Sequence, residues 1–505
     1  MRTASSTRRA GPWDTLSPLE GNLESARVDN GFIATDTIYS RHMFLSGYPL
    51  LHDARLGHSP AGRALRYLEA KFGYISFVPS RSVSALSPDL LREAQLLERS
   101  GIITAHHRVP APPDEPQVFS VRIMYGGHAR ENAGGSSFFS EDDAFSRALS
   151  EALERYLWHE TSDYFDAPLT ASEEELLMKK VPHVALSYIS GLPHRTGESS
   201  SIHERHKASL LWIRGQSLTD SKRTYLPAQL VSGPQVRSRS EPILRPHTTT
   251  GLATHFSRQT ARLNGILEIV ERDAFMISWL NRLAPDILPL EILTENNPRL
   301  MKSLSSCERY RLRPYVLRLL TDAPTHAIAI ILEDITGGTP RFSAGLKAHY
   351  SLDAAVTGAL LEALRARVNS RLDTEAPDAR KDAHRARLRY WRNADHAKQL
   401  EWMLSGRTSP ITEAPWSRDG ENEHFARLIE WCRSKRYNCI AVPLGTSRKN
   451  VTKRFVEMMI IPQLHPLPIH EKDFSDDNPR LVEVPRHFGN PARDQTFNRI
   501  PHPFV

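Results

Sequence analysis

One eight-residue pattern occurs three times in this chain, each time within a stretch whose apolar residues repeat with helical periodicity. The copies are ALSEALER at 148–155, GILEIVER at 265–272 and ALLEALRA at 359–366. Each copy carries a glutamate at its fourth position. Since residues i, i+3 and i+4 lie on one face of an α-helix, each copy gathers its charged side chains on a single face. The repetition predicts three helices with similar charged faces.

The first two copies share the pattern E-x-x-E-R, and the third departs from it. The charged residues are Glu151, Glu154 and Arg155 in the first, Glu268, Glu271 and Arg272 in the second, and Glu362, Arg365 and Arg367 in and after the third. Any one such helix is explained well by a solvated face, because an i,i+4 pair stabilises it by about 0.2–0.5 kcal/mol. Two features favour a shared site instead: the recurrence itself, and the apolar Phe275 and Trp279 that continue the face of Glu268.

Carboxylates gathered from separate helices repel one another unless a cation lies between them. Magnesium suits this position, because it binds carboxylate oxygens and substrate phosphates together. Arginines would then bind the phosphate oxygens through forked hydrogen bonds. The octets therefore predict a nucleotide triphosphate site, and not a P-loop, since G-x-x-x-x-G-K-[ST] is absent. Gly-containing turns at 133–137 and 248–255 could add backbone N–H groups.

The pattern of elements indicates a mixed α/β (α+β) fold. Helical periodicity covers 142–158, 258–282 and 352–371, and strand-like runs fall at 327–335 and 438–444. A chain of 505 residues is too long for one ordinary core. We therefore expect one large domain with appendages.

Shifts in composition suggest where these parts begin and end. We expect a disordered tail at 1–30, a small N-terminal docking module at 31–117 and a catalytic domain at 118–505. The module closes with a helical pattern, a Ser-Gly break and a β-branched strand, and the Pro-rich stretch 111–117 follows it. Within the catalytic domain, 373–423 is expected to be a charged surface insertion, and 499–505 an extended, Pro-containing tail.

Composition narrows the class of protein further. No apolar run is long enough to span a bilayer, and the basic start lacks the apolar segment of a secretory signal. The three cysteines, Cys307, Cys432 and Cys439, form no C-x-x-C pair, which favours isolated thiols in a cytoplasmic protein. The net charge of +7 comes without a basic block. We therefore expect neither nucleic acid nor membrane as a partner.

Three stretches of the sequence resemble the YcaO superfamily. They are FFSEDDAFSRALSEALERYLW at 138–158, TTTGLATHFSRQTARLNGILEIVERDAFMISWLNR at 248–282 and SAGLKAHYSLDAAVTGALLEALRAR at 343–367. The resemblance covers about 118–505 and leaves the N-terminal appendage outside. It implies the YcaO-type fold, which binds ATP through several Mg²⁺ ions held by helical glutamates.

The resemblance also implies roles for the octet residues. The Mg²⁺ ligands would be Glu151, Glu154, Glu268 and Glu271. The nucleotide-binding residues would be Arg155, Arg272, Glu362 and Arg367. One departure stands inside the third octet, because many relatives have glutamine where this chain has Arg365.

The last residues indicate the subfamily. Azoline-forming relatives end in Pro-x-Pro-x-Pro, and this chain ends in Pro501, His502, Pro503, Phe504 and Val505. The resemblance implies that this tail orders the catalytic site, with Pro501, Pro503 and Val505 as its catalytic positions. A frayed terminus is the plainer reading. The sequence does not identify the general base, for which His255 and His502 are candidates.

The resemblance implies an ATP-dependent cyclodehydratase of natural-product biosynthesis. Such an enzyme activates backbone amides of a ribosomal precursor peptide by O-phosphorylation and closes Cys, Ser and Thr residues into thiazolines and (methyl)oxazolines. The implied partners are the precursor peptide, an E1-like or RRE leader-binding protein and an FMN-dependent dehydrogenase. A homodimer would suit the family. Two alternatives remain: a YcaO enzyme forming thioamide or amidine, and a non-catalytic docking or scaffold protein.

Overall fold

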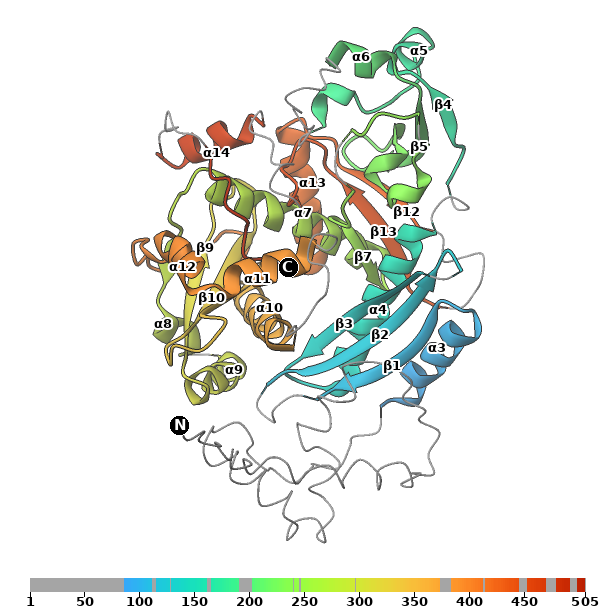
Figure 1. Ribbon diagram of the computed structural model, residues 1–505. Coiled ribbons are helices and arrows are strands. Elements are labelled where there is room, and N and C mark those ends of the chain that lie inside the picture. Colours follow the sequence, from blue (N-terminus) through green and yellow to red (C-terminus); the bar gives the residue numbers. More distant parts are fainter. Residues whose placement is uncertain are drawn as a thin grey trace, which may run out of the picture. The chain divides into compact units, whose positions relative to one another are not determined.

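The computed structural model describes residues 86–110, 115–127, 129–160, 165–189, 202–238, 240–244, 247–295, 297–372, 383–411, 414–444, 452–468, 478–490 and 497–504. The chain divides into two compact units, Met1–Phe77 and Val78–Val505. The first unit lies outside the described residues, and so do the predicted tail and most of the predicted docking module. Figure 1 shows the helices and strands of the second unit.

The first sheet is antiparallel and has three strands in the order β1-β2-β3. Its elements are α3 (Pro88–Arg99), β1 (Ile103–Val109), β2 (Gln117–Tyr125), β3 (Ala129–Ser137) and α4 (Glu141–His159). Helices α3 and α4 pack against this sheet. Phe119 of β2 meets Phe145 of α4 with ring centroids 5.1 Å apart. The side chain of Ser140 caps α4 by accepting a hydrogen bond from the Asp143 N–H.

The predicted boundary at residue 117 is wrong, because α3 and β1 belong to this sheet. Strand β1 pairs with β2 from Ile103 to Val109. Leu97 and Ile103 are buried in the same core as Phe145. The buried Arg454 Nε also lies 2.8 Å from Glu93 of α3. The helix and strand predicted at 88–109 exist, but they complete the sheet and core of the second unit and do not form a separate module.

The second sheet has the strand order β11-β10-β9-β8. Its strands are β8 (Asp286–Leu288), β9 (Leu312–Arg318), β10 (His326–Asp334) and β11 (Phe342–His349), with α8 (Leu290–Thr294), α9 (Pro298–Arg309) and α10 (Leu352–Leu372) alongside. The apolar run of β10 is covered on both faces, as such runs usually are. Ile328 and Ile330 join the core that contains Leu360 of α10, whereas Ala329 and Ile331 join the core that contains Phe275.

The third sheet has the order β4-β5-β12-β13-β7, with β6 paired to β5. Its strands are β4 (Leu169–Ala171), β5 (Leu210–Ser217), β6 (Arg223–Pro227), β7 (Leu252–His255), β12 (Ile440–Pro443) and β13 (Phe455–Ile460). The central helix α7 (Arg258–Leu280) contacts β7, β13 and β11 and so joins the third sheet to the second. Its residues are buried almost all round, which is why its hydrophobic stripe is broad.

Residues predicted as a charged surface insertion at 373–423 form part of the core where the structure describes them. They include α11 (Ala383–Arg392), α12 (Ala394–Ala397) and the 3₁₀ turn η6 (Lys398–Leu404). Trp391, Leu400 and Met403 are buried together with Trp279 of α7. The segment was predicted to be a surface insertion because of its many charges, but apolar residues between those charges face inward, and one charged residue, Arg387, is itself buried.

Shorter elements complete the unit. They are α5 (Glu173–Met178), η3 (Leu186–Tyr188), α6 (Ile202–Lys207), η4 (Ala228–Leu230), η5 (Pro234–Val236), α13 (Glu421–Ser434) and α14 (Arg480–His487). The three long helices and both strand-like runs predicted from periodicity are present, and the mixed α/β fold class is confirmed. The three cysteines are free and buried. Every helix within the described ranges is too short or too polar to cross a lipid bilayer.

Candidate active site

Each octet begins with a small residue where its helix backbone comes close to the strand before it. A Cβ on Gly135 of β3 would lie 2.2 Å from the Ala148 nitrogen, and one on Gly345 of β11 would lie 2.1 Å from the Ala359 oxygen. On α7 the glycine is on the helix, and a Cβ on Gly265 would lie 2.5 Å from the Gly251 oxygen. Glycine is required at these contacts because the backbone of the other element fills the space of a side chain.

The glutamate at the fourth position of each octet is held by the backbone just before its own helix. In all three copies its Oε2 accepts a hydrogen bond from a main-chain N–H. The donors are Gly134 to Glu151 at 3.1 Å, Gly251 to Glu268 at 2.9 Å and Leu346 to Glu362 at 3.0 Å. The shared sequence pattern therefore corresponds to a shared strand-to-helix geometry.

The residue at the seventh position of each octet reaches the strand that precedes the next octet helix. Glu154 of α4 lies beside Thr254 of β7. Glu271 of α7 accepts a 2.8 Å hydrogen bond from the N–H of Ala348 in β11. In the third octet the position is Arg365, whose Nη1 donates to the carbonyl oxygen of Gly134 in β3 at 3.2 Å.

These contacts arrange the three helices in a cycle. Helix α4 packs on β3 and β7, α7 packs on β7 and β11, and α10 packs on β11 and β3. Figure 1 shows α4, α7 and α10 between the three sheets. The structure thus brings Glu151, Glu268 and Glu362 to one region, although 211 positions separate the first from the last (362 minus 151).

The charges of the clustered glutamates perturb one another. Burial raises the pKa of Glu154 well above its usual range, and the negative charges of Glu151 and Glu268 raise it further. Burial also raises the pKa of Glu271, which comes to about 7. Nearby Lys347 opposes that increase, and Glu362 adds to it. Perturbed carboxylates at one place are typical of functional sites.

Two of the arginines predicted to bind phosphate lie in this cluster. Arg155 Nη2 is 2.7 Å from Glu151 and its Nη1 bonds Glu131 of β3. Arg272 Nη2 is 2.7 Å from Glu268. Burial alone would lower the pKa of Arg272, but the surrounding carboxylates raise it, so the guanidinium stays charged. Its buried Nε has no acceptor within the described chain, which leaves one N–H for a ligand oxygen.

The residues present fit a site for Mg²⁺ and phosphate. Within the described ranges, Glu154, Glu271 and Glu362 form no direct ion pair, although the charges of Lys347 and Arg272 act on Glu271. No three His, Cys, Asp or Glu side chains in those ranges converge into a ready-made metal cage. Magnesium usually binds through one or two carboxylates together with substrate phosphates, and this arrangement suits that mode.

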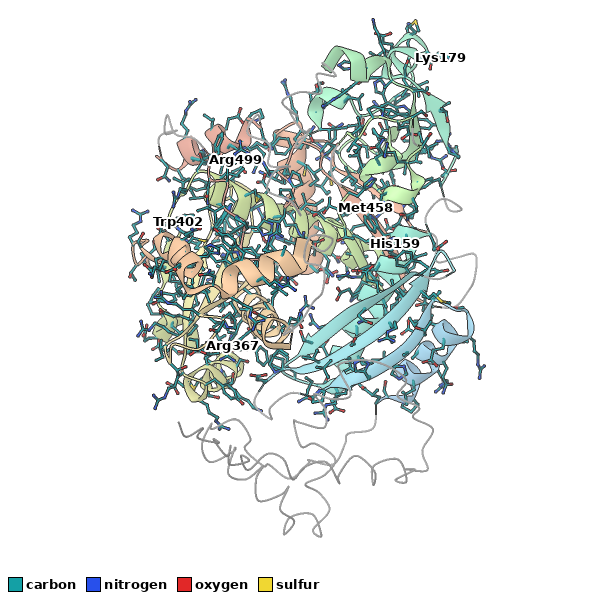
Figure 2. All side chains as sticks on the ribbon, in the orientation of Figure 1. His159, Lys179, Arg367, Trp402, Met458 and Arg499 are labelled. Carbon is teal, nitrogen blue, oxygen red and sulfur yellow. The ribbon has the colours of Figure 1, made fainter. Side chains whose placement is uncertain are left out.

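The structure places Arg367 away from this cluster. Its Nη2 forms a 3.0 Å ion pair with Asp334 of β10, and the side chain is buried. Five helical positions turn the side chain by about 140° from Glu362, so the two face different neighbours. Figure 2 labels Arg367 on α10. The prediction that Arg367 binds nucleotide is therefore not supported by its position, and Arg365 stands nearer to the clustered carboxylates.

The C-terminal tail docks on α7 just beyond the octet. Trp279 Nε1 donates to the Ile500 carbonyl at 3.1 Å, and Phe504 meets Phe275 with ring centroids 4.6 Å apart. His502 is buried, and its Nε2 lies 3.0 Å from the Pro468 oxygen. Residues 497–504 are therefore packed against the protein and do not form a frayed terminus. Val505, one of the three predicted catalytic positions, lies outside the described residues.

Pro501 and Pro503 are half-buried within the docked tail. Phe275 follows Glu271 by about one helical turn, so the tail lies along the same helix as the second octet. His502 faces the Pro468 carbonyl, and His255 hydrogen-bonds the Ser257 N–H through Nδ1. Neither candidate base is held against an octet glutamate by a hydrogen bond.

Sequence reasoning missed two residues at this site. Lys347 lies on β11 between the two N–H donors that hold Glu362 and Glu271. Glu131 on β3 binds Arg155 and lies 3.2 Å from His159 Nε2. Their positions in the sequence could have identified them. Each residue lies on the strand directly before an octet helix, within two to four residues of a glycine that contacts that helix.

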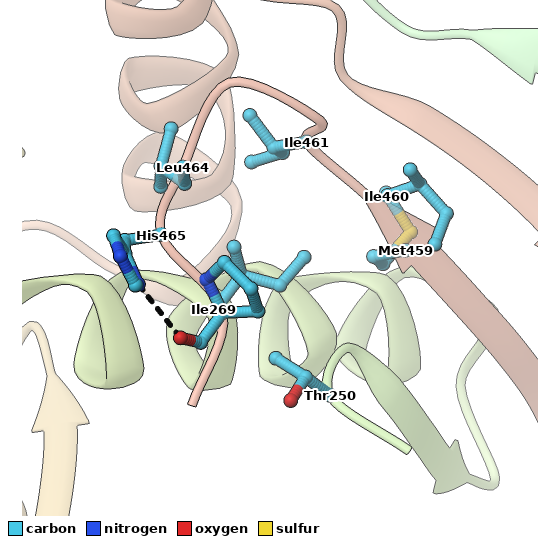
Figure 3. A pocket seen from close by; sticks show the side chains of 8 residues that line it. Thr250, Ile269, Met459, Ile460, Ile461, Leu464 and His465 are labelled. Carbon is cyan, nitrogen blue, oxygen red and sulfur yellow. Dashed lines mark hydrogen bonds between the residues drawn. The ribbon is translucent and has the colours of Figure 1, made fainter. Parts of the chain in front are cut away.

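A small apolar depression lies on a neighbouring face of α7. Its lining residues are Thr250, Ile269, Met459, Ile460, Ile461, Leu464, His465 and Pro466 (Figure 3). His465 Nδ1 lies 2.8 Å from the Pro466 carbonyl. Its lining is mostly apolar and contains no octet glutamate.

The fold and the cluster together are typical of a protein that binds a nucleotide and Mg²⁺. The chain belongs to the YcaO family, whose family model, described as YcaO cyclodehydratase, ATP- and Mg²⁺-binding, matches residues 138–465. ATP and Mg²⁺ are accordingly its cofactors.

Solved structures show the same fold. A heterocyclase in complex with substrate and cofactor has a TM-score of 0.64 at 17% identity, over 82% of this chain and 57% of that one. YcaO from Methanopyrus kandleri, bound with AMPPCP and Mg²⁺, has a TM-score of 0.57 at 18% identity, over 77% and 95%. The E. coli microcin synthetase McbBCD complex has a TM-score of 0.58 at 14% identity, over 79% and 96%.

A relative in sequence is a protein of unknown function from Methanothermobacter thermautotrophicus. It is 24% identical over 195 residues, which are 38% of this chain and 49% of the relative. The chain thus spans about half the length of this relative, and 57% of the heterocyclase.

Proposed function

We propose that this chain is an ATP-dependent cyclodehydratase. It would activate backbone amides of a ribosomal precursor peptide by O-phosphorylation and close Cys, Ser and Thr residues into thiazolines and (methyl)oxazolines. The observation that carries the proposal is the cycle of three octet helices, which gathers glutamates and arginines at one place. Family membership and the likeness of the fold to a heterocyclase support it.

The reaction needs an oxygen atom to leave a peptide. The substrate thiol or hydroxyl loses its proton and attacks the preceding carbonyl carbon. The tetrahedral adduct then loses the former carbonyl oxygen while the nitrogen loses its proton and a C=N bond forms. When bound, ATP would supply the phosphoryl group that makes this oxygen a phosphate leaving group, and Mg²⁺ would balance the charge of the phosphates. The protein's share is positioning and charge neutralisation.

Residues of the cluster suit these tasks. Arg155 and Arg272 would orient phosphate oxygens, since both stay charged beside their carboxylates. Glu151, Glu154, Glu268 and Glu271 would hold Mg²⁺. Glu271, with a pKa of about 7, can also hold or release a proton near neutral pH.

The tail supplies the argument for azoline formation. We propose that Pro501, Pro503 and Val505 order the catalytic site. Docking of Phe504 on Phe275 supports this, because it fixes the tail beside the helix that carries Glu268 and Glu271. Arg387 Nη1 also donates to the Phe504 carbonyl at 3.3 Å.

We further propose that the chain works with a precursor peptide and a separate E1-like or RRE leader-binding protein. An FMN-dependent dehydrogenase would oxidise the rings afterwards, and a homodimer is the proposed assembly. Support comes from the resemblance and from the fold it shares with a multiprotein synthetase complex. We also propose a cytoplasmic location.

The deciding experiment incubates the chain with its leader-binding partner, precursor peptide, ATP and Mg²⁺. We expect the peptide to lose the mass of one water for each ring. Glu268→Ala should abolish this loss, while Glu430→Ala, an exposed position on α13, should leave it unchanged. Circular dichroism would establish that both variants are folded.

The same assay separates the alternatives. Exchange of oxygen for sulfur would identify a thioamide-forming enzyme, and gain of an amine nitrogen with loss of oxygen an amidine-forming one. A wild-type chain that binds peptide but never nucleotide would be a docking or scaffold protein. Arg365, a cation where the other octets have glutamate, is the observation that keeps this last alternative in view.

A further inference from the structure

The cycle of octet helices contains one inverted charge. At the seventh position, α4 has Glu154 and α7 has Glu271, whereas α10 has Arg365. All three side chains nevertheless reach the strand before the next octet helix. The third copy has therefore kept the geometry of the repeat and reversed its charge.

Arg365 bridges the start and the end of the cycle. Its Nη1 donates to the Gly134 carbonyl at 3.2 Å and lies 3.8 Å from Glu151 Oε2. The same Glu151 oxygen accepts the Gly134 N–H at 3.1 Å. The guanidinium of Arg365 on α10 thus binds the carbonyl of Gly134 on β3, and the carboxylate of Glu151 on α4 binds the N–H of the same glycine.

Electrostatics indicates what the inverted charge does. The cluster contains five glutamates, and Glu154, Glu271 and Glu362 form no ion pair within the described ranges. Arg365, with 32% of its side chain exposed, places a fixed positive charge 3.8 Å from Glu151 of this cluster. A fixed guanidinium neutralises clustered carboxylates in the way that a bound cation does, and it needs no ligand exchange.

We propose that Arg365 is a built-in counter-ion that takes the place of one divalent cation between α4 and α10. The proposal rests on the proposed nucleotide site and deepens it. It has two consequences. The chain takes up fewer divalent ions with nucleotide than it would with a carboxylate at this position, and the contact between α10 and β3 forms without metal.

Counting bound metal tests the first consequence. Wild type, Arg365→Glu and Arg365→Lys are equilibrated with a non-hydrolysable ATP analogue and Mn²⁺, and bound Mn²⁺ is measured by electron paramagnetic resonance. We expect Arg365→Glu to bind one additional Mn²⁺ per chain and Arg365→Lys to match the wild type. Arg433→Glu is the matched control, since Arg433 lies exposed on α13 and its charge reversal should change nothing.

Thermal unfolding without nucleotide tests the second consequence. In EDTA, Arg365→Glu should lower Tm by about 2–4 °C or more, because the cluster then loses its fixed cation. Addition of Mg²⁺ alone should restore most of this loss, whereas Arg433→Glu, which breaks the pair of Arg433 with Glu430 on α13, should gain no more from Mg²⁺ than the wild type. Should the Glu variant fail to fold, Arg365→Gln serves in its place, with a smaller fall in Tm and a larger gain from Mg²⁺ than the wild type.

The outcomes separate this inference from the proposed function. Equal Mn²⁺ counts in wild type and Arg365→Glu, together with equal metal-free Tm values, would overturn the counter-ion role while nucleotide binding stands. Absence of nucleotide binding in every variant would overturn the proposed function. The EDTA and Mg²⁺ melting curves would still decide whether Arg365 replaces a cation.

Discussion

The backbone N–H of Ala348 on β11 donates a 2.8 Å hydrogen bond to Glu271 Oε2 on α7, 77 positions earlier in the chain. This contact ties the second octet to the strand that introduces the third. Glu271 is buried, and four other charged groups, Lys347, Glu362, Glu268 and Arg272, act on it. The acidity of this carboxyl therefore reports on the whole cluster.

The pKa of Glu271 predicts how pH affects the metal-free protein. Because its folded pKa, about 7, is above its usual 4.5, the folded state binds the proton more tightly than the unfolded state. Stability is then lost as pH rises from 4.5 through 7, by at most about 3 kcal/mol. Glu271→Gln should flatten this loss in urea titrations in EDTA at pH 5 and pH 8. An equally steep loss in the variant would mean that another group titrates.

The glycine before the third helix predicts a packing defect. In Gly345→Ala the new Cβ would lie 2.1 Å from the Ala359 oxygen and 2.4 Å from the Ala363 nitrogen. Separating β11 from α10 should cost about 1–3 kcal/mol or more, measured as a lower urea midpoint. Gly134→Ala is the control, because its Cβ meets nothing closer than 3.7 Å. Equal destabilisation of both variants would contradict the close approach.

The docked tail predicts that nucleotide binding and ring formation can be affected separately. Phe504→Ala should remove the contact with Phe275 and cost up to about 3 kcal/mol of unfolding free energy. Calorimetry should show nucleotide affinity within about 3-fold of wild type, while ring formation measured by peptide mass falls by about 10-fold or more. Phe488→Ala, at an exposed phenylalanine, is the matched control. Unchanged ring formation in Phe504→Ala would contradict the ordering role of the tail.

A second titrating group predicts acid sensitivity. Burial lowers the pKa of His349 and of His424 to about 4. The positive charge of Lys347 adds to this effect at His349, whereas at His424 the negative charge of Asp419 opposes it without outweighing burial, so both neutral forms are favoured in the folded state. As pH falls from 6.5 to about 4, the unfolded state binds more protons, and stability should fall by at most about 3 kcal/mol for each histidine.

Substitution can test this acid sensitivity directly. Neither ring nitrogen of His424 has a hydrogen-bond partner within the described ranges, so His424→Leu removes the titration without breaking a bond. Urea midpoints at pH 7 and pH 4.5 should differ less in this variant than in wild type. His487→Asn, at an exposed histidine of α14, should keep the full difference. If His424→Leu were as acid-sensitive as the wild type, the loss of stability at low pH would come from another group.

The octets, the long helices and the buried run of β10 could be predicted because periodicity is local. Residues three and four apart share a helix face whatever surrounds the helix, so Glu151 and Glu154 had to lie together. The small first residue of each octet was visible too. Its reason, a glycine in close backbone contact, became clear only with Gly135, Gly251 and Gly345 in place.

Three expectations failed because they rested on local sequence patterns, whereas the structure at those places is set by long-range packing. The boundary at 117 failed because β1 finds its pairing partner in β2. The surface insertion at 373–423 failed because Trp391 and Met403 turn toward Trp279. The expected placement of Arg367 beside the octet carboxylates failed because the rotation of α10 directs its side chain to Asp334, and its role in nucleotide binding stays a prediction.

The sequence by itself determined that three helices carry matching charged faces and that their charges suit metal and phosphate. Tertiary structure decided which helix faces meet, which arginine of α10 joins them and where the C-terminal tail packs. The physical reason is distance along the chain. The contacts that close the cycle join residues 77 and 231 positions apart, and only the packing of three sheets around α4, α7 and α10 brings such residues within hydrogen-bonding reach.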